Sequence, residues 1–245
     1  MARWAMVIDK ERCVGCQSCT VACKSEWDVP LGHARTKVRT TGVHGTYPNV
    51  SSVFFVSQCN NCTHPTCVPA CPSGATYQDA NGAVRVNTSL CIGCGSCVAA
   101  CPFGARYVNP VTAHVDKCDF CSPRLEKGLT PACVATCPAN AKIFGDLDDS
   151  NSSVHSLVFS GKAKRIAGTQ EKLGPNVYYL GTPEHVEMAG AAFPTGEPSM
   201  VAPGWIWTRL AKKLVYLAVG VTFAGQAVAF FRQLHEGESS VGEGE

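Results

Sequence analysis

Cysteines dominate the chemistry available to this chain. The sequence of 245 residues contains sixteen of them, in four sets of four with none left over. The sets are Cys13, Cys16, Cys19 and Cys23; Cys59, Cys62, Cys67 and Cys71; Cys91, Cys94, Cys97 and Cys101; and Cys118, Cys121, Cys133 and Cys137. The first and third sets read C-x2-C-x2-C-x3-C, whereas the middle gap widens to four residues in the second set and to eleven in the fourth. Such a repeat of thiols predicts four metal centres of one kind.

The two-residue gaps predict clusters of the [4Fe–4S] type. A tight loop with this spacing directs three thiolates to three corners of one small cube, and the fourth cysteine points away toward a neighbouring cluster, as in bacterial ferredoxins. Three sets also continue alike, with proline and small residues at 71–77, 101–107 and 137–143, each leading into a β-prone run. The proline ends a short helix, and the small residues let backbone N–H groups approach cluster sulfurs. A chain with four such clusters is expected to carry electrons.

Three other interpretations of the cysteines compete with this one. A disulfide framework also uses an even number of cysteines, but it does not explain four near-identical C-x2-C units. Structural zinc needs four local ligands, and it has no use for three cysteines at two-residue intervals plus a fourth before proline. The periodicity excludes free buried cysteines. Zinc is kept as the alternative that a metal analysis would discriminate.

The second and third sets are expected to form a two-cluster ferredoxin module. A strand over 75–78, a turn that contains Asn81 and Gly82, and a strand over 83–87 lie between their ligand loops, and Asn-Gly is a strong hairpin signal. If these sets exchange their fourth cysteines, the first and fourth sets are left to pair. The predicted ligands are Cys13, Cys16, Cys19 and Cys137 (site 1); Cys23, Cys118, Cys121 and Cys133 (site 2); Cys59, Cys62, Cys67 and Cys101 (site 3); and Cys71, Cys91, Cys94 and Cys97 (site 4). Spacing alone also leaves open a pairing of first with second and third with fourth.

The chain resembles the iron–sulfur (beta) subunits of membrane-bound molybdopterin oxidoreductases, which include polysulfide, thiosulfate, tetrathionate and dimethyl sulfoxide reductases. The resemblance covers roughly residues 4–150. It rests on CVGCQSCTVACK at 13–24, QCNNC at 58–62, CIGC at 91–94, KCDFC at 117–121, RLEKG at 124–128, PAC at 131–133 and FGDLDD at 144–149. It implies the same interleaved ligand sets. It also implies two partners, a large subunit that carries the molybdopterin and an integral membrane subunit that handles quinone.

The region after residue 149 carries weaker signals. A short helix is expected over 154–167 and a strand over 176–180, both packing on the cluster-bearing domain. Residues 189–203 contain three prolines and two glycines, so this stretch is typical of an extended linker. Neither a Gly-rich nucleotide loop nor a nucleophile with its base is found, so we expect no catalytic site. No basic run suggests nucleic acid, and four clusters of about −2 each would make the loaded protein acidic despite its formal charge of +2.

A second informative feature is the uncharged stretch 214–231. As a helix its roughly 18 residues would measure about 27 Å, which just spans a hydrocarbon core. Trp205 and Trp207 precede it where interfacial aromatics belong, and Gly225 and Ala229 belong to a small-residue stripe suited to packing on another membrane helix. The alternative is a buried helix of a soluble domain. We predict a single transmembrane helix.

The side of the membrane is predicted from charge. Arg209, Lys212 and Lys213 precede the stretch, whereas Arg232 and then four glutamates follow it, which favours a cytoplasmic cluster-bearing domain. No signal peptide or twin-arginine start is recognised before Arg3. The expected location is therefore the cytoplasmic face of a bacterial or archaeal inner membrane.

Together these features predict an α+β protein with two interleaved, bacterial-ferredoxin-like two-cluster modules and a C-terminal single transmembrane helix. The expected domains are 1–188 with four clusters, a Pro/Gly linker at 189–204, a membrane-anchoring helix with its flanks at 205–235, and an acidic tail at 236–245. The expected function is electron transfer through four [4Fe–4S] clusters between a molybdopterin catalytic subunit and a membrane quinone-reactive subunit. The alternative is a four-cluster redox module serving a haem or another dehydrogenase without molybdenum.

Overall fold

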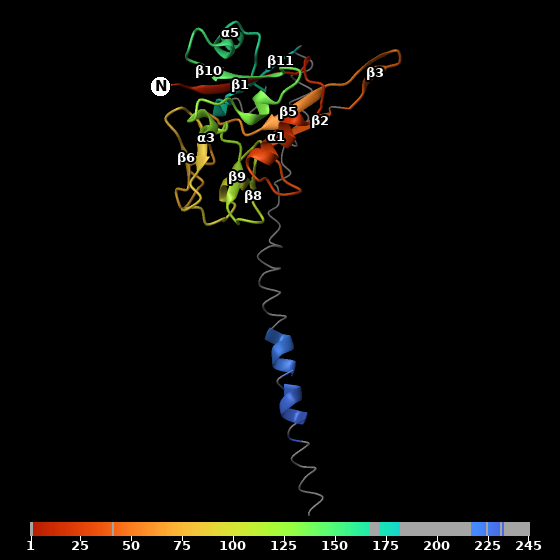
Figure 1. Cartoon of the computed structure of the whole chain (residues 1–245), viewed down its shortest axis with the longest axis vertical. Helices are drawn as coiled ribbons and strands as arrows, with labels where there is room; N and C mark the ends of the chain where they lie inside the picture. The colour runs from red at the N-terminus through yellow and green to blue at the C-terminus, as the bar shows by residue number, and fades with distance from the viewer. Residues whose placement is uncertain are drawn as a thin grey trace, which may run out of the picture. The chain divides into compact units, whose positions relative to one another are not determined.

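Two units make up the chain in the computed structural model, Met1–Ser199 and Met200–Glu245, and each is described by itself. The structure describes residues 2–40, 42–166, 172–181, 217–223, 225–230 and 232. In the first unit, strands and short helices surround the cysteine loops (Figure 1). The strands are β1 (Trp4–Asp9), β2 (Thr36–Thr40), β3 (His44–Thr46), β4 (Asn49–Ser51), β5 (Phe54–Gln58), β6 (Thr76–Gln78), β7 (Val84–Val86), β8 (Arg106–Val108), β9 (Val115–Lys117), β10 (Lys142–Asp146) and β11 (Val177–Leu180). The helices are α1 (Ser18–Glu26), α2 (Ser96–Ala99), α3 (Ser122–Leu125), α4 (Ala132–Ala135) and α5 (Ser153–Phe159).

The sheet β10-β1-β11 divides the hydrophobic core into two parts. β1 pairs antiparallel with β10 and parallel with β11. Because side chains alternate along a strand, Met6 and Ile8 belong to a core cluster that contains Cys19, Cys59, Cys118 and Cys133, whereas Ala5 and Val7 pack in another cluster with residues of α5. The cysteines are therefore part of the core and not an addition to its surface.

Each of the three Cys-Pro repeats leads into a strand, as predicted. β6, β8 and β10 all begin at the fifth residue after the last cysteine of a set. β6 pairs with β7, and β8 pairs with β9, as antiparallel hairpins. The predicted turn between β6 and β7 is confirmed, with the Gly82 amide donating to the Asp79 carbonyl at 2.9 Å. The hairpins thus place consecutive cysteine loops at a fixed separation.

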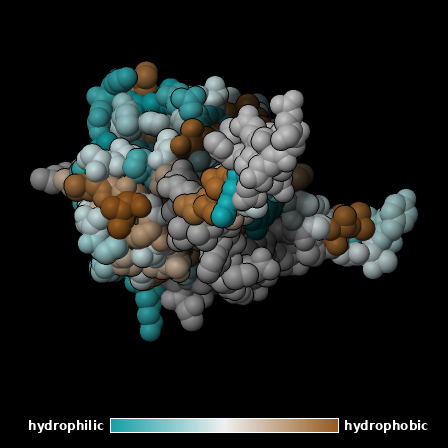
Figure 2. All heavy atoms as spheres, turned by 90° about the horizontal axis from the view of Figure 1, so that it is seen from below, coloured by the Kyte–Doolittle hydropathy of each residue, from teal (hydrophilic) through white to brown (hydrophobic). Residues whose placement is uncertain are grey.

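The β3–β4 hairpin projects from the first unit. β2 pairs with β5, and the chain between them continues into the β3–β4 hairpin, which extends away from the body as an arm (Figure 1). Figure 2 shows the same arm with hydrophobic surface between hydrophilic residues. Tyr47 in its turn is 88% exposed. This arm was not predicted from the sequence.

The two elements predicted after residue 149 are present, but the helix is shorter than expected. β11 matches the strand predicted at 176–180. α5 ends at Phe159, whereas the prediction extended it to residue 167, which lies outside the described residues. Gly161 has φ of +75°, a left-handed conformation that ends a helix, and Lys164 then forms a bridge with Tyr179. The chain after Gly161 therefore joins the edge of the sheet.

The second unit is described at 217–223, 225–230 and 232, which are helical. Among the residues that the structure describes, no helix is long and apolar enough to cross a membrane, so the transmembrane helix predicted over 214–231 is not supported there. Residues 214–216, 224 and 231 of that stretch, the predicted linker 189–204 and the predicted tail 236–245 lie outside the described part.

Candidate metal centres

The four C-x2-C loops share one backbone feature. In each loop, the residue before the second cysteine has a positive φ: Gly15 (68°), Asn61 (41°), Gly93 (69°) and Phe120 (60°). A left-handed residue here reverses the chain, so that both cysteines can face one centre. A Cβ atom on Gly93 would lie 2.1 Å from the Ala113 carbonyl oxygen, and one on Gly15 would lie 2.5 Å from the Phe54 ring. Glycine is therefore required in these two loops on steric as well as conformational grounds.

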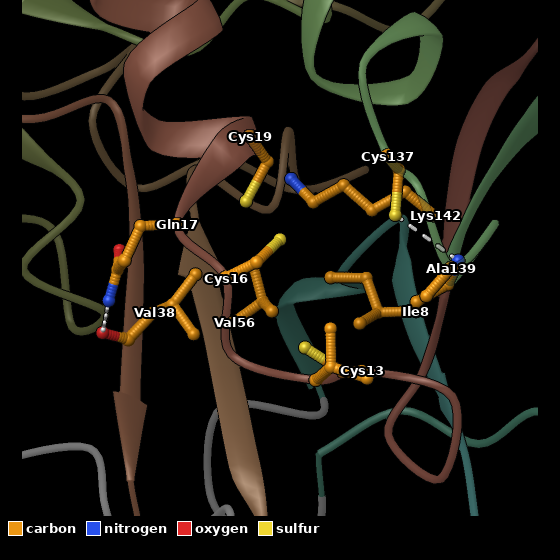
Figure 3. Close-up of a pocket in the computed structure, with 12 residues that line it drawn as sticks. Ile8, Cys13, Cys16, Gln17, Cys19, Val38, Val56, Cys137, Ala139 and Lys142 are labelled. Carbon is orange, nitrogen blue, oxygen red and sulfur yellow. Dashed lines mark hydrogen bonds between the residues drawn. The ribbon is translucent and has the colours of Figure 1, made fainter.

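Site 1 is a small cavity lined by its four predicted cysteines. Cys13 and Cys16 belong to the loop between β1 and α1, Cys19 is on α1, and Cys137 comes from the loop before β10. Figure 3 shows these side chains around a common space, with the amine end of Lys142 near Cys19. The Cys137 sulfur also accepts a hydrogen bond from the Ala141 amide at 3.3 Å, the kind of contact predicted for the small residues after Cys-Pro.

Site 2 is a small cavity lined by Cys23, Cys118, Cys121 and Cys133. Its cysteines come from α1, from the loop after β9 and from α4. Trp27, which follows α1, donates from its indole Nε1–H to the Cys121 sulfur at 3.3 Å. The guanidinium group of Arg35 lies 4.7 Å from the Trp27 ring centre and pairs with Asp116 at 2.6 Å. This tryptophan is thereby held against the site.

Site 3 is a small cavity lined by Cys59, Cys62, Cys67 and Cys101. Cys59 directly follows β5, and Cys101 follows α2. The guanidinium Nη2 of Arg106 donates to the Cys67 sulfur at 2.9 Å. A charged donor to a sulfur favours the thiolate, which is the form that binds iron.

The predicted cysteines of site 4 are described by their individual contacts. The Cys71 sulfur accepts from the Thr76 amide at 3.4 Å, and the Cys91 sulfur accepts from the Val115 amide at 3.4 Å. Cys97 is buried in a core cluster that also contains Cys67 of site 3. The grouping of Cys71 with Cys91, Cys94 and Cys97 rests on the sequence repeat and stays a prediction.

Three of the four predicted ligand sets line a common cavity each, and the binding of one cluster by each set stays a prediction. Site 1 combines cysteines of the first and fourth sets, and site 3 combines the second and third, instead of first with second. Four thiols line each cavity, three from one cysteine set and one from another, and four thiols are the donor set that a [4Fe–4S] cluster needs. Within the described ranges, no group of three or more His, Cys, Asp or Glu side chains is arranged to hold a single metal ion. Ligation of iron by these sixteen cysteines stays a prediction.

The thiols of these sites differ in their acidity. Burial, reinforced by neighbouring cysteines, raises the pKa of Cys23 and of Cys62 to about 12, and it raises the pKa of Cys118 well above its usual range. Thiolates are thus unfavourable there unless positive charge compensates them. Iron would supply such charge, so we expect metal loading and folding of this core to be coupled.

Buried cations surround the sites, and the sequence reasoning missed them. Lys142, Arg106 and Lys117 are all buried. Burial disfavours the charged form of Lys142, but the sulfurs of Cys133, Cys19 and Cys118 outweigh it, so its pKa lies above the ordinary value. A signal was present, because Arg106 and Lys142 occupy the same position of the Cys-Pro repeat.

Comparison with protein families and curated proteins agrees with these sites. A "4Fe-4S dicluster domain" matches residues 50–147, and a "4Fe-4S binding domain" matches residues 4–25. The chain is 43% identical over 181 residues to a tetrathionate reductase subunit of Salmonella typhimurium, a match that covers 73% of this chain and 72% of that one. It is 38% identical over 213 residues to a selenate reductase subunit of Mesobacillus selenatarsenatis, covering 73% and 72%. It is also 48% identical over 150 residues to the thiosulfate reductase electron transfer subunit PhsB of Salmonella typhi, covering 60% and 78%.

By their names, these three relatives are subunits of reductases, and PhsB is an electron transfer subunit. Their similarity covers 60–73% of the chain, and the two family models match residues 4–25 and 50–147, so the family resemblance predicted from the cysteine motifs is confirmed. The chain belongs to the iron–sulfur (beta) electron-transfer subunits of the molybdopterin oxidoreductases.

Proposed function

We propose that this chain relays single electrons through four [4Fe–4S] clusters, between a molybdopterin-containing catalytic subunit and a membrane subunit that reacts with quinone. The observation that carries the proposal is the set of three cavities, each lined by four thiols from two separate segments. Each cluster, when bound, takes up and releases one electron. The contribution of the chain is to hold four such groups in a row and to shield most of their ligands from water.

Residues shared between neighbouring sites support the order 1-2-3-4. Lys142 lies within electrostatic reach of Cys19 of site 1 and Cys133 of site 2. Asn61 donates from its amide nitrogen to the Cys59 carbonyl of site 3 at 3.3 Å and to the Cys118 carbonyl of site 2 at 3.5 Å. Arg106 contacts site 3 and reaches Cys97, which is assigned to site 4. Sites 1 and 4 are then the two ends of the series.

The exposed cysteines belong to these two end sites. Cys16 of site 1 and Cys94 of site 4 are exposed, whereas Cys118 of site 2 and Cys59 of site 3 are buried. Each exposed cysteine has an apolar neighbour in its loop, Val14 (62% exposed) or Ile92 (68% exposed). Solvent-facing apolar residues beside a redox site suit docking of another subunit. We therefore place electron entry and exit at these two loops.

The membrane partner and the location are supported by sequence features. The uncharged stretch 214–231 and the preceding Trp205 and Trp207 favour association with a membrane subunit. The basic residues at 209, 212 and 213 favour a cytoplasmic position for the cluster-bearing unit. These parts of the proposal are tested separately from the cluster content.

Metal analysis of anaerobically purified, full-length chain tests the central proposal. Four cubane clusters predict about sixteen iron atoms and as many sulfides per chain. Stoichiometric zinc with little iron would contradict it. The metal of a co-purifying large subunit tests the partner, because molybdenum supports the proposal, whereas a haem or another dehydrogenase without molybdenum favours the alternative redox module.

A further inference from the structure

The internal repeat places a buried cation at the same position in two of its copies. Arg106 is the fifth residue after Cys101, and Lys142 is the fifth residue after Cys137. They are the first residues of β8 and β10, and they are only 2% and 4% exposed. The third copy of the repeat has the neutral Thr76 at this position. Lysine and arginine are seldom buried without a compensating partner, so these two positions call for an explanation.

Lys142 lies at the junction of sites 1 and 2. Its ammonium group donates to the side-chain oxygens of Gln58 at 2.8 Å and Thr36 at 3.2 Å, which are both neutral. It lines the cavity of site 1, and Figure 3 shows its amine end near Cys19. On its other side the ammonium group lies within electrostatic reach of the site 2 sulfurs of Cys133 and Cys118. One positive charge is thus shared by two sites.

Arg106 lies in the equivalent place between sites 3 and 4. Its Nη2 donates to the Cys67 sulfur at 2.9 Å, and its Nη1 donates to the Thr76 hydroxyl at 3.2 Å. Cys59, Cys67 and Cys101 of site 3 and Cys97 of site 4 lie within its electrostatic reach. The neutral Thr76, which follows Cys71 in the remaining copy of the repeat, is therefore a hydrogen-bond partner of Arg106.

Neither cation has a carboxylate partner within the described part of the chain. This separates them from Arg35, which pairs with Asp116 and Asp119. A buried charge that only neutral oxygens and thiols surround is costly, unless negative charge is supplied from elsewhere. Loaded [4Fe–4S] sites supply this negative charge. Each cluster with its four thiolates carries a net charge of about −2 when oxidised, and reduction adds one further negative charge.

We propose that Lys142 and Arg106 are equivalent potential-setting residues, one for each two-cluster module. Lys142 raises the reduction potentials at sites 1 and 2, and Arg106 raises those at sites 3 and 4. A fixed positive charge stabilises the reduced, more negative state over the oxidised state, and it offsets the repulsion between two neighbouring reduced sites. The inference rests on the proposed function, since it requires iron–sulfur clusters at these sites.

The test compares Lys142→Met and Arg106→Met in the full-length, anaerobically loaded chain, by redox titration followed by electron paramagnetic resonance. Methionine keeps a long apolar side chain without charge. In Lys142→Met, two of the four midpoint potentials should fall by about 59 mV or more, a tenfold or larger change in the equilibrium constant of reduction. In Arg106→Met, the other two midpoint potentials should fall. Lys142→Arg keeps the charge and should restore the first pair.

Lys10→Met is the matched control. Lys10 is also buried, but its ammonium group lies within electrostatic reach of Glu11 instead of a cysteine. Its replacement should leave all four potentials unchanged. Equal shifts in the control and in Lys142→Met would overturn the inference, because they would reflect loss of any buried lysine.

Loading of each variant is measured first as iron and sulfide content. If the methionine variants load fully and their reduction potentials do not change, the inference is overturned but the proposed function is not. If Lys142→Met fails to load, Lys142→Gln replaces it, since glutamine is neutral and can still donate to Gln58. If neither neutral variant loads while Lys142→Arg does, the charge serves assembly and the proposed setting of potentials is wrong. A wild-type chain without iron overturns the proposed function instead, and this inference with it.

Discussion

Single residues decide which segment completes each site. Cys137 is separated from Cys13 by more than a hundred residues, yet both line the cavity of site 1. Its sulfur accepts a backbone hydrogen bond from Ala141, at the start of the strand that pairs with β1. The crossed fourth cysteine thereby ties the last repeat to the first.

Replacing Cys137 with serine should disturb site 1 and leave sites 3 and 4 intact. Serine keeps the size of the side chain but is a poor ligand for iron, so the cluster at site 1 should lose its fourth thiolate. We expect one of the four paramagnetic signals to change or disappear in resonance spectra of the reduced protein. Cys101→Ser is the matched variant, and it should affect site 3 instead. Loss of the cluster held by Cys91, Cys94 and Cys97 in Cys137→Ser would show that the third and fourth sets pair.

Other single residues adjust the sites without acting as ligands. Trp27 donates to a sulfur of site 2, and Arg106 donates to a sulfur of site 3. Hydrogen bonds to cluster sulfurs and local net charge are among the features that set reduction potentials. The two modules therefore have different surroundings even though their ligand patterns repeat.

At the scale of elements, the ligand loops depend on left-handed residues between fixed supports. The loop of Cys91 and Cys94 packs on the turn between β8 and β9, and its Gly93 lies against the Ala113 carbonyl. The His114 ring is also hydrogen-bonded to the Cys91 carbonyl at 2.9 Å. The β8–β9 hairpin thus supports the loop of site 4 from outside.

Gly93→Ala should destabilise the protein more than Gly128→Ala. Both glycines have a positive φ, of 69° and 72°, so alanine costs about 1–2 kcal/mol of conformational strain at either place. A Cβ atom at Gly93 additionally meets the Ala113 oxygen at 2.1 Å, whereas nothing lies within 4 Å of one at Gly128. The measurement is the thermal unfolding midpoint together with iron content. Equal losses in the two variants would contradict the steric support of this loop.

At the scale of the whole molecule, all sixteen predicted ligands lie in the first unit. Their cavities are built from β1, β5, α1 and the hairpins, and all of these precede residue 200. The second unit therefore contributes no ligand. Its proposed role is to associate with a membrane partner.

Truncation after Pro203 should leave the iron content of the chain unchanged, because it removes no ligand. It should weaken retention of the chain by its membrane partner subunit. Iron analysis and membrane fractionation of the truncated and full-length chains, each expressed with the partners, measure the two effects. A full-length chain that is soluble and monodisperse when expressed alone would contradict the membrane role of the 214–231 stretch.

Local sequence was sufficient for the chemistry of this protein. The C-x2-C spacing specifies a cubane site because the geometry of one tight loop is set by a few neighbouring residues. The β6–β7 hairpin was predictable for the same reason, since Asn81 and Gly82 favour a tight turn. The helix expected over 154–167 was too long, because Gly161 adopts a left-handed conformation just after Phe159, where the helix ends.

Only the tertiary structure decided which distant segments meet. Spacing left two pairings of the cysteine sets open, because contacts between residues far apart in the sequence leave no local pattern, and the cavities combine the first set with the fourth. The burial of Lys142 and Arg106 could not be predicted from their residue types, since lysine and arginine are usually exposed. Packing β10 against β1 and beside the cysteine loops buries Lys142 next to sulfur, a placement that depends on the whole fold.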